Sequence, residues 1–399
     1  MVALADCNSF FASVERAFHP GLKNRPVCVL SSNDGNIVAL TPEAKALGIR
    51  RGDPLFKVRN VIDKNNVAIF SGNLMLYAAM SKRVQSIMRQ CVSRTEPYSI
   101  DEQFLYLDGY EAHHDLVKMM REMVEKIRLW TDIPVSVGIA RTKTLAKVAS
   151  KFAKKYPGYR SVCIIDNDER RRKALGISMP LEFADKPGEW VLRHFHKPGY
   201  QTWRELNGYP CIDTSEIQDR QTITTSRSFG SMITSLDELK ASVASFTASC
   251  AATLRSQNSS AGEVTVFIMS NRFREDLPQY MNCDSERLDL PSSDTLELTH
   301  AALKIVERIY RTGIHYKKSG VILSRIADGL TQPVLFDHVP NRKERIDLSQ
   351  CIDNMNLKFG LKTVRLGVEG EEDSIWKVKS DFRTPNYLTD IDELLTINV

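Results

Sequence analysis

The chain has 399 residues and a formal net charge of +5, and 42% of its residues are apolar and 26% charged. These are the proportions of an ordinary globular protein, so a disordered, collagen-like or coiled-coil chain is excluded, and the length predicts about two to four domains. No apolar run approaches the ~20 residues that cross a bilayer, so we expect no membrane span. The first residues have an acid at Asp6 and no basic flank, so we expect no secretory signal and place the protein in the cytoplasm.

Strands and helices alternate over the first 165 residues. The expected strands are Val2–Asp6, Pro26–Leu30, Thr95–Ile100, Gln103–Leu107, Pro134–Ala140 and Val162–Ile165, and the expected helices are Ser9–Ala17, Glu43–Leu47, Leu74–Val92, Leu116–Leu129 and Thr142–Tyr156. With residues 20–75 set aside as an inserted subdomain, the order becomes β-α-β-β-α-β. This order predicts the split βαβ, or ferredoxin-like, arrangement, which puts the end of the first strand beside the turn of the central hairpin.

Three acids meet if that topology is right. Asp6 ends the first strand, and Asp101 and Glu102 lie between the two hairpin strands. An acidic pair in a turn often serves only solubility, but a third carboxylate beside it favours a divalent metal. Mg²⁺ prefers oxygen ligands and keeps waters, and two such ions roughly 3.5–4 Å apart stabilise the attacking and leaving oxygens of a phosphoryl transfer. The backbone carbonyl of Cys7 is a further candidate ligand.

The whole positive excess lies in one stretch. Residues 134–173 carry eleven Lys and Arg against three acids, a net charge of +8. Within it, Lys143, Lys147, Lys151 and Lys154 fall in an arc of roughly 80° on an amphipathic helix, which predicts an outward-facing lysine stripe. A solvated helix face usually mixes both signs of charge. Because the expected helix Thr142–Tyr156 contains no acid, its lysine stripe favours a phosphate-rich partner.

The second half predicts another α/β unit and a tail. Residues 169–207 are polar and helical in patches, and Thr222–Arg325 follows the order strand, helix, strand, strand, helix, strand. The tail from Ala327 shows little core-forming pattern. The eight cysteines include no CxxC pair, so we expect scattered reduced thiols rather than a zinc or dithiol site.

Five stretches resemble the signature motifs of the Y-family DNA polymerases. They are DCNSFFASVE from Asp6, PEAK with LGI from Pro42, YSIDE from Tyr98, GIARTKTLAK from Gly138 and SRSFG from Ser226. The resemblance runs nearly end to end and is to the UmuC-like branch. It implies an α+β, right-hand fold with a ferredoxin-like palm, small fingers, a helical thumb and an α/β little finger.

The resemblance also implies roles for residues of this chain. Asp6, Asp101 and Glu102, with the Cys7 carbonyl, hold two Mg²⁺ ions as the catalytic site. Phe11, where related chains often have Tyr, is the gate whose ring rejects a ribose 2′-hydroxyl. The other implied contacts are Phe10, Lys45 and Lys154 to the nucleotide and Lys147, Lys151 and Arg227 to DNA. Lys45 stands where many members have Arg, so a point charge replaces a bidentate fork.

The implied domains are a palm over 1–165 with fingers at about 20–75, a thumb over 166–215, a little finger over 221–327 and a tail over 328–399. The thumb departs from the family pattern. Only a Leu-Gly-Ile stub at 175–177 stands where a helix-hairpin-helix should be, so something over 20 residues are missing. We therefore expect retained metal binding and a weakened grip on primer-template DNA.

The resulting hypothesis is a template-directed, low-fidelity DNA polymerase for translesion synthesis in the SOS response. Its implied partners are primer-template DNA, dNTP, a UmuD′-like dimer, a RecA filament and a sliding clamp bound through Gln332, Leu335 and Phe336, which fit a QxxLF clamp-binding peptide. The alternative is a catalytically weak scaffold for DNA, clamp and UmuD′. A nucleotide cyclase on the same palm topology is disfavoured because the chain has no GG[DE]EF-type signature.

Overall fold

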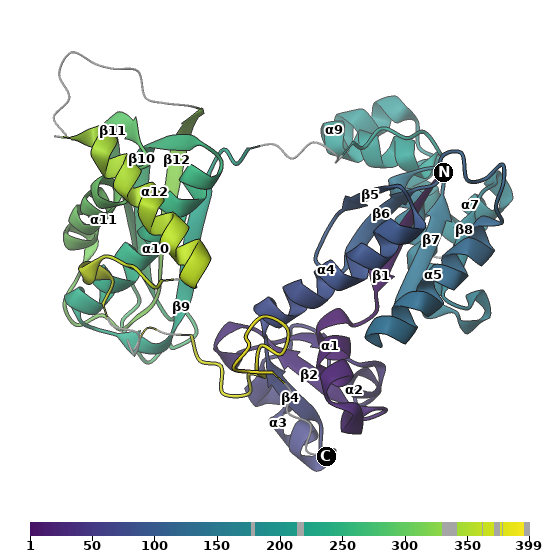
Figure 1. The fold of residues 1–399 in the computed structure, drawn as a ribbon, viewed down its shortest axis with the longest axis horizontal. Coiled ribbons are helices and arrows are strands. Elements are labelled where there is room, and N and C mark those ends of the chain that lie inside the picture. Colours follow the sequence, from purple (N-terminus) through teal and green to yellow (C-terminus); the bar gives the residue numbers. More distant parts are fainter. Residues whose placement is uncertain are drawn as a thin grey trace. The chain divides into compact units, whose positions relative to one another are not determined.

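The computed structural model divides the chain into two compact units, 1–217 with 380–399 and 218–379 (Figure 1). It describes residues 1–176, 180–213, 219–328, 341–360, 362–370, 376 and 378–394. Within these residues no helix has both the length and the apolar character needed to span a bilayer. Each unit has its own hydrophobic core.

A five-stranded sheet forms the centre of the first unit. Its strands are β1 (Val2–Cys7), β5 (Arg94–Pro97), β6 (Glu102–Tyr106), β7 (Val135–Ala140) and β8 (Val162–Ile165), in the order β5-β6-β1-β7-β8. All neighbours are antiparallel except β7 and β8. The first four strands confirm the predicted split βαβ order, and β8 extends the sheet beyond it.

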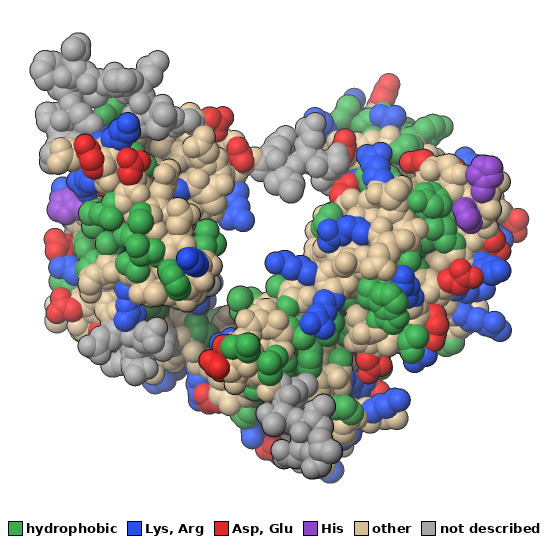
Figure 2. All heavy atoms as spheres, viewed as in Figure 1, with side chains coloured by type: hydrophobic (Ala, Val, Ile, Leu, Met, Phe, Trp, Pro, Cys, Tyr) green, Lys and Arg blue, Asp and Glu red, His purple; other side chains and the backbone are tan. Residues whose placement is uncertain are grey.

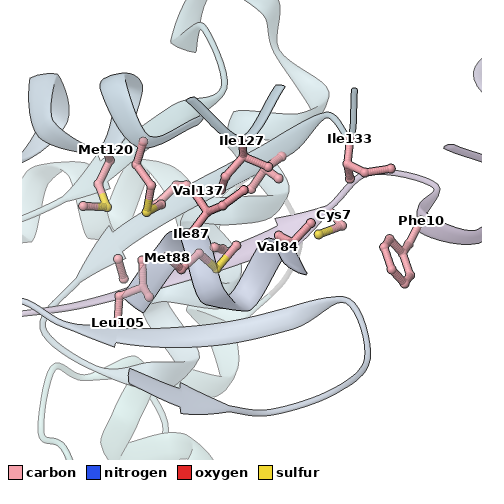
Figure 3. Close-up of a cluster of buried hydrophobic side chains, with 14 of the residues drawn as sticks. Cys7, Phe10, Val84, Ile87, Met88, Leu105, Met120, Ile127, Ile133 and Val137 are labelled. Carbon is pink, nitrogen blue, oxygen red and sulfur yellow. The ribbon is translucent and has the colours of Figure 1, made fainter. Parts of the chain in front are cut away.

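Alternate residues of β1 face two different cores. Ala3, Ala5 and Cys7 pack on the face covered by α4 (Leu74–Cys91) and α5 (Leu116–Thr131), as Figure 3 shows for Cys7 among residues of these elements. Val2 and Leu4 pack on the opposite face against α6 (Lys143–Lys155). The two-residue period of a strand therefore puts Asp6 on the α6 side of the sheet.

The segment between β1 and α4 forms a smaller layer. It contains α1 (Phe10–Phe18), β2 (Val27–Leu30), β3 (Ile37–Leu40), α2 (Pro42–Ala46), α3 (Leu55–Lys64) and β4 (Ala68–Ser71). The sheet order is β3-β2-β4. The sequence predicted only β2 of these strands. All three are four residues long, but only β2 is buried throughout and runs continuously apolar between turn residues.

Three helices follow β8 and cover the α6 side of the sheet. They are α7 (Asp168–Gly176), α8 (Pro180–Ala184) and α9 (Gly188–Leu206), which kinks at His196 (φ 55°) just before Pro198. The Thr142 hydroxyl donates to the Glu205 carbonyl at 2.8 Å, which ties the end of α9 to the start of α6. Residues 177–179, which include the last residue of the Leu-Gly-Ile stub at 175–177, lie outside the described residues.

The second unit is a four-stranded antiparallel sheet packed against helices. Its order is β11-β10-β12-β9, and its elements are β9 (Ile223–Ile233), α10 (Leu236–Ser256), β10 (Ser259–Ser270), β11 (Met281–Ser292), α11 (Thr295–Ile309), β12 (Tyr316–Asp328) and α12 (Arg342–Phe359). Trp376 is buried in this core, 5.8 Å from the Phe246 ring. The tail shows little core-forming pattern in the sequence, and no periodicity around Trp376 indicates that this residue is buried. Short 3₁₀ turns occupy Pro20–Leu22, Ser32–Asp34, Pro157–Tyr159 and Gly367–Glu369.

Candidate active site

Pairing between β1 and β6 brings three acidic residues together. Asp6 lies directly opposite Glu102 in the antiparallel register, and the Cys7 amide donates to the Asp101 carbonyl at 2.9 Å. The loop 98–101 turns tightly because the amides of Tyr98 and Ser99 both donate to the Glu102 carbonyl at 3.0 Å. Backbone hydrogen bonds therefore hold these positions side by side in the fold.

Two lysines of α6 reach this acidic cluster. Lys154 Nζ lies 3.0 Å from Asp6 Oδ1, and Lys147 Nζ lies 3.5 Å from Glu102 Oε2 and 4.3 Å from the Tyr98 ring centre. Both lysines are exposed, as is Lys151 one helical turn away. Lys154 and Lys147 therefore supply the positive charge beside the carboxylates of Asp6 and Glu102.

Lys143 does not belong to the exposed stripe. It is only 8% exposed, and its ammonium lies 2.9 Å from the buried Glu96 carboxylate of β5. The prediction of four outward lysines was wrong at this position, because the Lys143 side chain lies over the sheet, near the rings of Phe104 and Tyr106, and reaches the edge strand β5.

The pKa values of Asp6 and Glu102 show that negative charge is crowded here. Burial raises the pKa of both carboxyls, and the Asp101 charge raises each pKa further, while Lys154 and Lys147 oppose these effects. A cation at this point would relieve the same repulsion.

The donor chemistry of the cluster fits a hard divalent cation. Its side chains offer only carboxylate oxygens, the ligands that Mg²⁺ prefers. Burial raises the pKa of the Cys7 thiol, whose side chain lies in the apolar cluster of Figure 3, so only its carbonyl remains as a ligand. In the described part of the chain, no three His, Cys, Asp or Glu side chains are grouped so that they could hold a metal ion. The carboxylates of Asp6 and Glu102 instead contact Lys154 and Lys147.

The chain turns sharply from β1 into α1 beside the acids. Ser9 adopts a left-handed conformation (φ 49°), and the Ser13 hydroxyl donates to the Asn8 carbonyl at 2.7 Å. The Phe10 ring is buried in the core, so only its backbone remains available to a ligand. The Phe11 ring is partly exposed and stacks on Tyr77 of α4, with centroids 4.4 Å apart and planes 17° apart.

Sequence reasoning missed two residues behind Phe11. Tyr77 supports its ring, and the Tyr77 hydroxyl donates to the buried Glu15 carboxylate at 2.6 Å. Glu15 lies four residues after Phe11, so the two share one face of α1. The four-residue spacing of Phe11 and Glu15 could have indicated that Glu15 lies close to the Phe11 ring. Nothing in the sequence indicates that Tyr77 packs against α1.

The remaining predicted contacts lie apart from this cluster in the sequence. Lys45 is exposed on α2, and Arg227 is exposed on β9 of the second unit. The peptide with Gln332, Leu335 and Phe336 lies outside the described residues. Lys and Arg side chains are spread among acidic and apolar ones over the visible face of each unit, so neither sign of charge covers that face (Figure 2).

Three family models match the chain. They are the impB/mucB/samB family over residues 5–151, the impB/mucB/samB family C-terminal domain over 220–334, and a domain of unknown function over 347–397. The protein UmuC of Salmonella typhimurium is 36% identical, over 100% of both chains. DNA polymerase IV of Acetivibrio thermocellus is 25% identical, over 91% of this chain and 96% of its own. The solved structure of a Y-family DNA polymerase chimera of Dbh and Dpo4 superimposes with a TM-score of 0.61 at 20% identity, covering 82% of this chain and 99% of that one.

Proposed function

We propose a specific function for this chain, which belongs to the impB/mucB/samB family and is a DNA-directed DNA polymerase of the translesion type. In this proposal it extends primers across damaged template, at low fidelity and in the SOS response. Its metal-binding site consists of Asp6, Asp101 and Glu102. The observation that carries the proposal is the β1–β6 register, in which Asp6 faces Glu102 while Cys7 is hydrogen-bonded to Asp101. A one-residue slip of this register would turn the Glu102 side chain to the other face of the sheet, away from Asp6.

Polymerases of this fold use divalent metal ions, and we assign two Mg²⁺ ions to the three carboxylates and the Cys7 carbonyl. When bound, such ions stabilise both oxygens of the phosphoryl transfer between the primer 3′-oxygen and the nucleotide α-phosphate. The acids of this chain hold the ions. With cations on these carboxylates, Lys154 and Lys147 would be free to bind phosphate oxygens.

The nucleotide contacts follow from the surroundings of the acids. Lys154 binds the triphosphate together with Lys45 of α2 and the free amides of the first turn of α1, which begins at Phe10. Phe11 lies beneath the sugar and excludes a 2′-hydroxyl by steric clash. Its support on Tyr77 limits how far the ring can yield.

DNA binding is shared between the two units in this proposal. Lys147 and Lys151 of α6 and Arg227 of β9 bind backbone phosphates, which makes the affinity dependent on salt. The reduced thumb, 166–215, removes phosphate contacts on the primer side, so the complex is short-lived. The clamp peptide at 332–336 compensates by tethering the enzyme, and a UmuD′-like dimer and a RecA filament are the further partners we propose.

Primer extension with Mg²⁺ tests this function. We expect short products on undamaged and abasic-site templates, and fewer still as salt rises. Restoring a helix-hairpin-helix after Gly176 should lengthen the products and reduce their salt dependence. Clamp binding without extension on any template would instead support the scaffold.

A further inference from the structure

The C-terminal residues 380–394 belong to the same compact unit as the active site. They form hydrogen bonds with residues of α1 and β4 and with Asn73 at the start of α4. The Phe382 amide donates to Ser71 Oγ at 2.9 Å, and the Ser71 amide donates back to the Phe382 carbonyl at 3.0 Å. In Figure 1 this yellow segment lies against β2 and β4. It falls in the part of the chain that matches a domain of unknown function.

Thr384 is the deepest polar contact of this segment. Its side chain is 6% exposed, and its hydroxyl donates to Glu15 Oε1 at 3.2 Å. The Asn73 side-chain amide donates to the Thr384 carbonyl at 2.8 Å, and Asn73 also caps α4 by accepting from the Leu76 amide. The segment is therefore anchored at the start of the helix that carries Tyr77.

Glu15 connects Thr384 to the aromatic pair. The same Oε1 atom accepts from the Tyr77 hydroxyl at 2.6 Å, and Glu15 is fully buried. Its Oε2 has no hydrogen-bond partner among the described residues. The hydrogen bonds from the Tyr77 and Thr384 hydroxyls therefore offset a large part of the free-energy cost of burying the Glu15 carboxyl away from water.

We propose that Thr384 is a positioning residue for sugar selection, which acts through Glu15 and Tyr77 to fix the ring of Phe11. The proposal rests on the function above, in which Phe11 meets the sugar. A steric gate discriminates only as well as its ring is held, because a ring that shifts by a fraction of an ångström no longer clashes with a hydroxyl. The segment would therefore tune substrate choice without touching the substrate.

The test is the ratio of kcat/KM for a dNTP to that for the matching rNTP, measured on the full chain with undamaged primer-template DNA. Thr384→Val keeps the side-chain shape and removes the hydroxyl. We expect the ratio to fall about fivefold, the factor that corresponds to one hydrogen bond. Because both rates come from one preparation, a loss of folded enzyme alone leaves the ratio unchanged.

Two variants serve as matched controls. Thr384→Ser keeps the donor and should keep the wild-type ratio. Thr389→Val makes the same substitution at an exposed threonine of the same segment and should also leave the ratio unchanged. A fall caused equally by Thr389→Val would assign the effect to general disturbance of the segment and overturn the proposal.

Phe11→Ala separates this inference from the proposed function. If Phe11→Ala admits ribonucleotides while Thr384→Val matches the wild type, the role of Thr384 is wrong and the gate stands. If Phe11→Ala leaves the ratio unchanged, the gate assignment itself fails and the inference falls with it.

Hydrogen–deuterium exchange gives a readout that needs no activity. We expect Thr384→Val to speed amide exchange in the first turn of α4, over 73–77, and in α1, whereas Thr389→Val should not. Unchanged exchange in both helices would overturn the proposed link from the segment to Phe11.

Discussion

The Lys154 ammonium lies 3.0 Å from the Asp6 carboxylate, although 148 positions separate the two residues in the chain. The contact exists because α6 packs back across the sheet over β1, with Gly138 of β7 allowing the close approach. It places a cation beside a carboxyl whose pKa is raised by burial and by the neighbouring Asp101 charge. The same cation is our candidate ligand for the nucleotide triphosphate.

Replacing Lys154 by Gln should raise the KM for dNTP about tenfold and change kcat less. A phosphate contact made in both the bound substrate and the transition state affects mainly binding. Lys155→Gln is the matched control, because its ammonium lies 5.2 Å from the Tyr156 ring rather than at the acids. Equal KM values for the two variants would remove Lys154 from the nucleotide site. Steady-state primer extension measures both constants.

Asp101→Asn should lower primer extension by about 100-fold or more while raising the thermal midpoint of unfolding. Activity falls because a metal ligand is lost. Stability rises because the Asp101 charge adds to the burial that already raises the pKa of Asp6 and Glu102. Thermal unfolding and extension are measured on the same preparation. Asp132→Asn, an exposed position that Asn tolerates, should change neither, and a lowered midpoint in Asp101→Asn would contradict this account.

Stability should fall as pH rises through the titration range of Glu15. Burial raises the pKa of Glu15 to about 7 from 4.5, and hydrogen bonds from Tyr77 and Thr384 only partly oppose it. Between those two pH values the folded chain keeps a proton that the unfolded chain has lost, so the free energy of unfolding decreases by ~3 kcal/mol from below pH 4.5 to above pH 7. Urea unfolding at pH 5 to 8 should show a clearly steeper fall in the wild type than in Glu15→Gln, which keeps only the smaller contributions of acids such as Asp6 and Glu102. Glu122→Gln, at an exposed acid of α5, should keep the wild-type slope; parallel curves for all three proteins would refute the assignment.

Gly138→Ala should destabilise the first unit by about 3 kcal/mol or more. A Cβ at Gly138 would lie 2.0 Å from the Ser150 amide nitrogen and 2.2 Å from the Ala146 carbonyl oxygen, so α6 would have to move off β7. At Gly158 a Cβ meets no atom within 4 Å, and Gly158→Ala is the control. Chemical denaturation with a probe in the first unit measures the difference. An equal free energy of unfolding for the two variants would show that the helix can retreat freely.

The central sheet could be predicted because its strands alternate or run continuously apolar between clear turns. Leu4 and Val137 are each buried on one face of the sheet, and the pattern along β1 and β7 already contains that information. The register that puts Asp6 opposite Glu102 then follows from the topology. Within the acidic cluster, the contacts of Asp6 and Glu102 with lysines could not be predicted, because sequence periodicity carries no information on rotamers.

The errors share one physical cause. Lys143 faces the buried Glu96 because of how one end of α6 lies over a neighbouring strand, which a single-helix projection cannot contain. The contact between Thr384 and Glu15 joins residues 369 positions apart through one hydroxyl. Such contacts depend on tertiary packing, and no local pattern in either segment announces them.

The Thr384 contact with Glu15 can form only late in translation. Translation releases β1 and α1 first, yet the hydroxyl that completes the surroundings of Glu15 emerges only after almost the entire polypeptide has left the ribosome. Until then the nascent palm holds a carboxyl with one donor fewer. A stop codon anywhere between the codons of α4 and Thr384 would remove this donor permanently, so the full set of contacts at Glu15 requires translation at least as far as Thr384.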